Sequence, residues 1–409
     1  MRWLVRYVVA MLIIALAVGC QSDVPMVNLG IDDVYSVYRM RTLRLHPEYP
    51  GDGYLWTMPD ASGADSVVCT DRDYYFCAPA AGDYTLKLRI ASTSDPVEHT
   101  TLIRVWDEDV SYSRYIADVL EYRPAPGQFI NELPKYDEGD TEADMCRKVL
   151  ECIGGKNDVL VSLGNYGGYV TFAFDHTVVN IPGEYDFRID GNSFYSASNP
   201  NPDAPGPGGS AEPGIVMVSV DCNGNGLPDD PWYELAGSEY SSPLTYHNYN
   251  VTYFRPAPEH EPVKLNGSIV DAEYIRYEGS DGGVGYVEKN VYHSQDYWPR
   301  WIDTDVMSFT GTRLANNGVD ESHQGNYYVL YCYPWGYVDN HPNTEGDLSC
   351  FKIDWAVDSN GYPVHLNGVD FIRVYTGVNQ QCGWLGETST EISRAEDLHI
   401  PDGTPLPNL

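Results

Sequence analysis

Short runs in which apolar and polar residues alternate are the feature that most limits what this chain can fold into. Gly, Pro and Asp separate the runs, and long stretches with the spacing of an amphipathic helix are missing. Alternation places successive side chains on opposite faces of a β-strand, and the intervening residues favour turns. The pattern predicts an all-β protein. Strands are expected in TLRLHP, GYLWTM, DYTLKLRI and TTLIRVW, and further on in GYVTFAF, EYDFRI, GIVMVSV, NYNVTYF, NYYVLYCY and VDFIRVYT.

The distribution of these runs predicts the domain organisation. Residues 25–108 are expected to form a small β-sandwich of immunoglobulin type, and residues 156–409 a larger jelly-roll β-sandwich that binds a ligand. Residues 109–155 are expected to connect the two. Within this connector, DTEADMCRKVLECI has acidic residues early, basic residues later and a glycine stop at Gly154, which predicts one short helix.

The N-terminus, MRWLVRYVVAMLIIALAVGC, has the pattern of a secretory signal. Arg2 and Arg6 precede an apolar run that is short for a membrane span. We interpret residues 1–20 as a lipoprotein signal peptide with lipidation at Cys20, although Val18 makes the lipobox degenerate. An uncleaved N-terminal anchor is the alternative, but no stop-transfer pattern follows the run.

Composition limits the partners of the chain. Acidic residues outnumber basic residues by 59 to 25, which argues against binding to nucleic acid or to an anionic membrane surface. Eight cysteines besides Cys20 form an even count in an exported chain, so disulfides are one interpretation and free buried thiols the other.

The stretch DCNGNGLPDD resembles a calcium-binding loop. Its alternating oxygen-bearing side chains and its glycines suit a hard, oxygen-seeking cation such as calcium. The match to an EF-hand loop fails at its twelfth position, which is Trp232. The alternative is a hairpin rich in Asx turns with no ion. If calcium binds, we expect it to order the loop that presents Trp232 and Tyr233. The predicted metal ligands are Asp221, Asn223, Asn225, the carbonyl of Leu227, Asp229 and Asp230.

Three further stretches combine aromatic side chains with polar ones: NVYHSQDYWPRWIDTD, YCYPWGYVDNHPN and TGVNQQCGWLGETSTEI. Aromatic faces with hydrogen-bonding edges suit flat ligands and sugars. The alternative is a set of buried aromatic residues. The predicted ligand-binding residues are Trp232, Tyr233, Tyr292, Tyr297, Trp298, Trp301, Trp335, Tyr337, Asp339, Asn340, Gln380 and Trp384.

The motifs of common enzyme classes are missing. The sequence holds no Gly-x-Ser-x-Gly, His-Glu-x-x-His or phosphate-binding glycine loop. Glu387 and Glu391 could pair, but the acidic composition favours exposed acids at both positions. A glycan hydrolase that used Glu387 with Asp339 would need the two carboxylates about 5 to 10 Å apart. We therefore predict a protein that is not an enzyme.

Several stretches, taken in order, resemble a known group of proteins. They include SLGNYGGYVTFAFDHTVVN, AEPGIVMVSVDCNGNGLPDDPWYELAGSE, YWPRW, WGYVDN and VDFIRVYTGVNQQCGWLGETSTE. Over roughly residues 118–398 they resemble the large C-terminal domain of surface lipoproteins from Bacteroides-type gut bacteria. Tyr54-Leu55-Trp56 followed by GDYTLKL resembles the PKD modules that accompany this domain.

The resemblance implies a function. Similar lipoproteins accompany TonB-dependent transporters of cobalamin-uptake loci, so the chain is expected to be anchored by its lipid to the outer membrane and exposed at the cell surface. It would bind cobalamin, a ligand that is transported rather than used as a catalytic cofactor, and pass it to the transporter. A glycan-binding surface lipoprotein is the alternative, because sugars use the same aromatic and polar chemistry.

Overall fold

The computed structural model describes residues 28–60, 62–92, 96–107, 111–155, 157–197, 201–204, 206–265 and 267–401. These fall into two compact units. The smaller unit holds the described residues up to Tyr35, Leu45–Tyr74 and Thr85–Leu102, and the larger unit holds Ser36–Arg44, Tyr75–Tyr84 and the described residues from Ile103 onward. The expected signal peptide and Cys20 lie outside the described residues.

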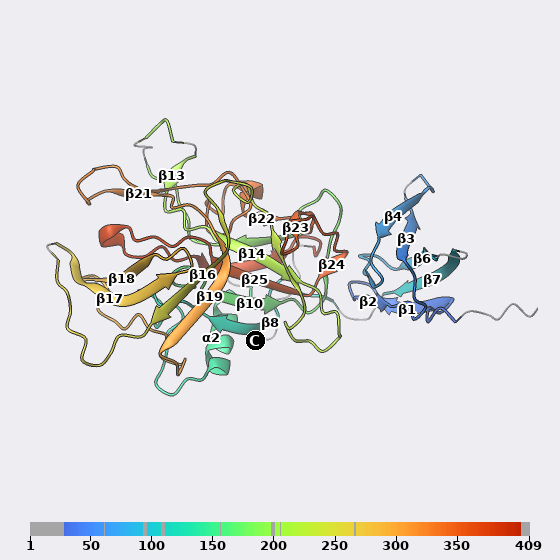
Figure 1. The fold of residues 1–409 in the computed structure, drawn as a ribbon, viewed down its shortest axis with the longest axis horizontal. Helices are drawn as coiled ribbons and strands as arrows, with labels where there is room; N and C mark the ends of the chain where they lie inside the picture. The colour runs from blue at the N-terminus through green and yellow to red at the C-terminus, as the bar shows by residue number, and fades with distance from the viewer. Residues whose placement is uncertain are drawn as a thin grey trace, which may run out of the picture. The chain divides into compact units, whose positions relative to one another are not determined.

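The N-terminal strands form a five-stranded sheet and a two-stranded sheet (Figure 1). The side chain of Trp56 is fully buried, and its indole N–H donates to the carbonyl of Asp71 at 2.9 Å. Leu86, Leu88 and Ile90 alternate with exposed residues along one strand, as the period-two pattern predicts. The five-stranded order is β1 (Val34–Tyr38), β7 (Val97–Trp106), β6 (Gly82–Ala91), β3 (Gly53–Pro59) and β4 (Asp65–Cys69), and the pair is β2 (Leu43–Leu45) and β5 (Tyr74–Phe76).

A six-stranded sheet forms the centre of the larger unit (Figure 1). Neighbouring strands in it pair in antiparallel fashion. The segment predicted as a connector supplies β8 to this sheet, so it takes part in the fold of the larger unit. The order is β23 (Ala356–Val357), β15 (Trp232–Leu235), β14 (Gly214–Ser219), β25 (Phe371–Thr376), β10 (Tyr169–Ala173) and β8 (Asp118–Arg123).

A four-stranded sheet and several short pairings complete the larger unit. The four-stranded order is β18 (Val284–Asn290), β17 (Ile269–Gly279), β16 (Tyr246–Phe254) and β19 (Val306–Arg313). The three-stranded sheets are β22 (Cys350–Phe351), β12 (Phe187–Asp190) and β27 (Arg394–Asp397), and β13 (Gly208–Gly209), β21 (Tyr328–Tyr331) and β20 (Gly318–Asp320). The pairs are β11 (Val178–Val179) with β24 (Gly368–Val369), and β26 (Glu391–Ile392) with β9 (Val161–Ser162). Short 3-10 helices span Gly346–Ser349, Ile353–Trp355 and Gly383–Leu385.

The core of the larger unit lies between side chains of both main sheets. β14 and β25 are buried on both faces along nearly their whole length, which explains why GIVMVS reads as an unbroken apolar run. Val216 of β14 and Val374 of β25 belong to the same buried core as Val251 and Tyr253 of β16. Burial of this kind removes roughly 25 cal/mol of unfavourable hydration per Å² of apolar surface and dominates the stability of the unit.

The α-helix α2 (Glu142–Ile153) lies where DTEADMCRKVLECI predicts a helix. The Thr141 side chain accepts from the backbone N–H of Asp144, and the Asp144 side chain accepts from the backbone N–H of Thr141. Met145, Val149 and Ile153 are buried at intervals of four residues and join the core. Figure 1 shows the helix beside β8.

The all-β prediction is confirmed, because strands make up nearly all the regular structure of the described residues. None of the helices in that part of the chain is long and apolar enough to span a membrane. None of the eight described cysteines forms a disulfide in the structure.

Candidate functional site

A cavity beside β15, which we call the β15 cavity, is a candidate site of the larger unit. Its volume is about 460 Å³. It combines aromatic, carboxylate, amide and hydroxyl side chains, the mixture that small polar ligands require. It is lined by Met217, Trp232, Glu234, Tyr240, Ser241, His247, Asn248, Thr310–Thr312, Val357–Gly361 and Tyr375.

Strand geometry brings the polar and aromatic groups of the cavity together. Trp232 and Glu234 are two residues apart on β15, so they project from the same face of the sheet. Met217 pairs directly with Glu234 across the β14–β15 ladder. His247 and Asn248 lie in an irregularity of the β16–β19 pairing, and Asn248 has a φ of 55°. This bulge directs a part of β16 toward the cavity.

A chain of hydrogen bonds links the carboxylate to the cavity wall. Oε2 of Glu234 lies 2.5 Å from Oγ1 of Thr312, and this hydroxyl lies 3.2 Å from Nδ1 of His247. Nε2 of His247 lies 3.0 Å from the carbonyl oxygen of Tyr240. A carbonyl only accepts, so Nε2 must carry a proton.

The Thr312 hydroxyl can donate to an ionised Glu234. It can instead accept from a protonated Glu234 and donate in turn to Nδ1 of His247. Burial raises the pKa of Glu234 to about 7, while the Thr312 hydroxyl opposes the rise. The cavity can therefore present this carboxyl as a donor or as an acceptor near neutral pH.

Aromatic rings and a turn complete the cavity. The guanidinium carbon of Arg373 lies 4.2 Å from the centre of the Trp232 ring, and the Tyr240 and His247 rings have centroids 4.5 Å apart. Asp358 accepts hydrogen bonds from the backbone N–H groups of Asn360 and Tyr362. The bond from the Tyr362 amide is the largest cause that lowers the pKa of the exposed Asp358 carboxyl. The rim thus carries an ionised carboxylate.

Most of the predicted ligand-binding residues lie inside the core. Gln380 bonds the backbone and side chain of Asn317, and Asn340 bonds the backbone N–H and carbonyl of Tyr333. Trp301 stacks on Tyr122 with ring centroids 5.5 Å apart. The buried-aromatic alternative describes the position of these residues, and their ligand roles remain predictions. The buried residues are Tyr297, Trp298, Trp301, Tyr337, Asp339, Asn340 and Gln380.

The remaining predicted ligand-binding residues retain exposed surface but do not form one site. Trp232 lines the β15 cavity, and Tyr233 on the same strand is half-buried. Tyr292 and Trp384 are 66% and 39% exposed, and their rings meet edge to face with centroids 6.3 Å apart. Trp335 packs instead against Trp355, with ring centroids 4.7 Å apart. Their ligand roles remain predictions.

Residues 221–230, which we call the Asp221 loop, are held by bonds between their own side chains and backbone. Asp221 accepts from the N–H groups of Gly224, Asn225 and Gly226. The Asn225 side-chain amide donates to Asp229. The Asx-turn alternative therefore describes the observed hydrogen bonds, and the calcium role of the predicted ligands Asp221, Asn223, Asn225, Leu227, Asp229 and Asp230 remains a prediction.

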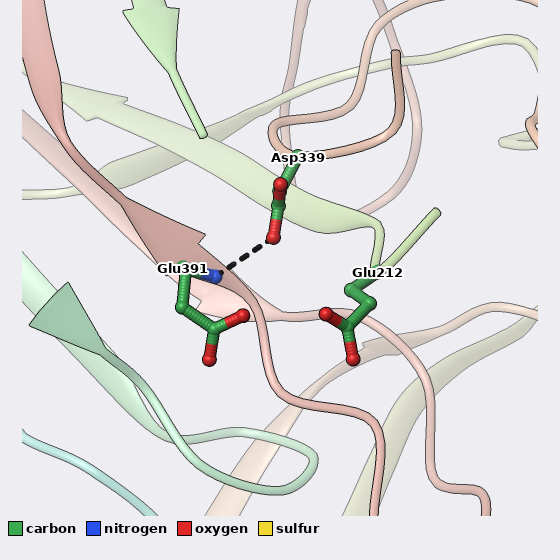
Figure 2. Close-up of side chains that lie close together, drawn as sticks. All are labelled: Glu212, Asp339 and Glu391. Carbon is green, nitrogen blue, oxygen red and sulfur yellow. Dashed lines mark hydrogen bonds between the residues drawn. The ribbon is translucent and has the colours of Figure 1, made fainter. Parts of the chain in front are cut away.

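Three acidic side chains converge elsewhere, and we call them the carboxylate triad. Glu212, Asp339 and Glu391 each contribute a carboxylate oxygen to a group whose members lie within 4.8 Å of one another (Figure 2). Asp339 accepts from the backbone N–H groups of Asn192 and Ser193 at 2.7 and 2.8 Å, and from that of Glu391 at 2.9 Å. Among the described residues, no other group of three His, Cys, Asp or Glu side chains has this spacing.

The expectation of exposed acids at Glu387 and Glu391 is wrong. The two residues are 3% and 4% exposed. Burial raises the pKa of Glu387 to about 8, because a charged carboxylate loses its hydration there. Composition describes the average acid of the chain, whereas these two lie between strands and loops that enclose them.

Sequence reasoning missed most of the β15 cavity. Tyr240 and His247 lie in YSSPLTYHNY, which mixes aromatic and polar residues just as the selected stretches do. The same criterion could have found them. Thr312 and Asn360 belong to strands and turns with no such composition, and only the folded chain brings them to the cavity.

Comparisons with known proteins do not identify the chain. It matches no protein-family profile, and no curated protein is significantly similar to it. Among solved structures, similarity is found to carbohydrate-binding modules from the β-sandwich superfamily, with 9% identity, 88% of this chain and 93% of that chain covered and a TM-score of 0.15. A SusE-like protein shows 7% identity, 88% and 92% coverage and a TM-score of 0.25. A quinonprotein alcohol dehydrogenase-like protein from Bacteroides thetaiotaomicron shows 10% identity, 63% and 47% coverage and a TM-score of 0.16. Similarity this weak carries no statement about function.

Proposed function

We propose that this protein is a glycan-binding protein that captures a sugar in the β15 cavity without transforming it. The observation that carries the proposal is the combination of Trp232 and Tyr240 with the hydrogen-bonded chain from Glu234 to His247 in one cavity. A sugar ring presents C–H groups that pack on aromatic faces and hydroxyl groups that need donors and acceptors. Glu234 can serve as either partner.

The size of the cavity favours a sugar over cobalamin. Its volume of about 460 Å³ lies in the lower half of the roughly 300–1,000 Å³ found for small-molecule sites. A corrinoid carries a broad macrocycle with many amide arms and exceeds a drug-sized ligand. We therefore favour a glycan over cobalamin as the ligand, and capture of cobalamin for a TonB-dependent transporter is the less favoured hypothesis.

Attachment to the outer membrane is part of the same proposal. A lipid at Cys20 would hold the protein at the cell surface, where a bound sugar could pass to a transporter. Calcium in the Asp221 loop would order the turn that leads into β15 and so support Trp232.

Binding to immobilised glycans, followed by calorimetry with the sugar that binds, tests the proposal. Trp232→Ala should weaken binding by about tenfold or more, because it removes an aromatic wall of the cavity. Glu234→Gln should remove any change in affinity with an inflection near pH 7. Trp106→Ala, at a tryptophan 54% exposed on β7, is the control and should bind normally. Binding of cyanocobalamin but no glycan, lost in Trp232→Ala, would replace the sugar with the corrinoid.

Glycoside hydrolysis is the second candidate function. One cavity holds Glu234 with a raised pKa and Asp358 with a lowered pKa, the division of roles that a general acid and its partner carboxylate need. Capture is favoured over hydrolysis, because Asp358 already accepts hydrogen bonds from backbone N–H groups of the turn in which it lies. Release of reducing sugar by the wild type, absent in Glu234→Gln, would establish hydrolysis.

A further inference from the structure

The carboxylate triad places three acids from distant parts of the chain in one buried group. Glu212 precedes β14, Asp339 follows Val338 in the loop after β21, and Glu391 begins β26. Asp339 and Glu391 are buried, and no Lys, Arg or His of the described residues forms an ion pair with any of the three. Three ionised carboxylates cannot remain together in such a place without protons or a cation, because burial and mutual repulsion both oppose their charge.

An unsatisfied oxygen at Glu391 marks the position in the triad where a proton or a cation would bind. Oε1 of Glu391 is buried and has no hydrogen-bond partner, although the residue is only 4% exposed. Figure 2 shows the Glu391 carboxylate directed toward Glu212, with Asp339 beside it. An unpaired buried carboxylate oxygen costs free energy, and protein structures rarely leave one without a ligand. The hydroxyl of Ser193, whose N–H donates to Asp339, is also buried without a partner.

We propose that Glu212, Asp339 and Glu391 bind a divalent, oxygen-seeking cation, with calcium as its chemical class. Calcium binds oxygen at about 2.3–2.6 Å, so two oxygens on one ion lie at most about 5 Å apart. The triad oxygens lie within 4.8 Å of one another, which one central ion can bridge after small side-chain adjustments. The site is separate from the Asp221 loop and from the β15 cavity.

The ligand chemistry selects the class of cation. The site offers carboxylate oxygens and no sulfur or imidazole nitrogen, which favours calcium, magnesium or manganese over zinc or copper. Calcium tolerates irregular geometry, whereas magnesium requires a nearly ideal octahedron and keeps several waters. A site with three carboxylates from three separate segments of the chain suits the larger and less demanding ion.

The bound ion would join three segments that hydrogen bonds already bring together at this point. The backbone N–H of Glu212 donates to the carbonyl of Asp339, and that of Glu391 donates to the Asp339 carboxylate. An ion at the centre of the triad would be coordinated by carboxylate oxygens of all three side chains. It would thereby hold the loop that carries Asp339 against β14 and β26.

Metal analysis and thermal unfolding of the purified full-length chain test the proposal. The chain is treated with a chelator, dialysed into calcium, and assayed for bound metal by mass spectrometry. We expect bound calcium and a melting temperature that rises by several degrees with calcium, because an ion that binds only the folded state stabilises it. Magnesium should produce a smaller rise. A wild-type chain that retains no metal and shows no calcium response would overturn the proposal.

A matched pair of variants assigns the calcium to the triad. Glu391→Gln removes one charge while leaving the backbone bonds to Asp339 in place, so it should fold and lose one bound ion per chain with its share of the calcium response. Glu387→Gln makes the same chemical change at a buried acid outside the triad and should keep the wild-type metal content. If protons rather than an ion occupy the triad, Glu391→Gln keeps the full metal content, and the proposal fails.

Discussion

Asp339 and Asp221 accept the same set of hydrogen bonds in opposite surroundings. Each aspartate accepts three backbone N–H bonds, two at one carboxylate oxygen and one at the other. Asp339 is 3% exposed and lies beside two other acids, whereas Asp221 is half-buried at the start of an exposed loop. The two aspartates therefore accept equal numbers of backbone hydrogen bonds, and they differ in access to water and in neighbouring acids.

The difference shows that burial rather than hydrogen bonding decides how these acids behave. Burial, and then the charge of Glu391, raise the pKa of Asp339 well above its ordinary value even though three N–H donors favour the ionised form. In an exposed turn, hydrogen bonds outweigh burial and the pKa of an aspartate is lowered. A hydrogen bond from the Ser322 side chain is the largest cause that lowers the pKa of Asp320 to about 2. The same residue type thus carries its charge easily at the surface and at a cost inside.

The strongest test of the comparison between Asp339 and Asp221 is to remove each aspartate in a separate variant. Asp339→Ala should lower the free energy of unfolding by about 3 kcal/mol or more, because it leaves the buried N–H groups of Ser193 and Glu391 and the partly buried N–H of Asn192 without an acceptor. Asp221→Ala should cost about 1 kcal/mol, since water can reach the freed N–H groups of Gly224, Asn225 and Gly226. Urea unfolding of both variants, in calcium-free buffer, measures the difference. Equal losses would show that burial is not the deciding factor.

A pH series on Glu387 is expected to show the next largest effect. Burial raises its pKa to about 8 from 4.5, so between these values the folded protein binds more protons than the unfolded chain. The free energy of unfolding should therefore fall as pH rises through this window, by about 1 kcal/mol per pH unit from this group. In Glu387→Gln the share of this decline that comes from Glu387 should disappear, so the variant gains stability relative to the wild type from pH 5 to pH 8, while Glu234 continues to contribute its own share.

Chemical unfolding at each pH provides the measurement for Glu387. Asp358→Asn is the matched control, because its exposed carboxyl has a lowered pKa and cannot contribute a decline in that window. A wild-type slope that persists unchanged in Glu387→Gln would place its origin in other groups.

The smallest expected effect lies in the Asp221 loop. Asn225→Ala removes the acceptor for the N–H of Leu227 and the donor to Asp229, yet all three residues are exposed. We expect a loss of less than about 1 kcal/mol in calcium-free buffer. A loss that becomes larger when calcium is added would support the predicted calcium role of this loop, and a loss that is the same with and without calcium would argue against it. Thermal unfolding in both buffers distinguishes these outcomes.

The aromatic stretches show where sequence reasoning stops. YWPRW and WGYVDN combine aromatic with polar residues, a composition that suits both a ligand site and a core. Trp298 is buried with the guanidinium of Arg255 at 5.3 Å from its ring, while Trp232 reaches a cavity. Nothing in the local sequence separates these two tryptophans, because exposure depends on which distant strand covers the ring.

The sequence by itself determined the all-β class, many of the strands and the helix, because period-two and period-four spacing and capping residues act over a few neighbours. Thr141 with Asp144, and GIVMVS as a strand buried on both faces, are examples. Only the tertiary structure decided which acids share a site. Glu212, Asp339 and Glu391 are separated by more than fifty residues at each step, and Glu234 meets Thr312 only across two sheets. Burial and proximity are properties of the packed chain, and they determine which of its many carboxylates bear charge, hold protons or bind an ion.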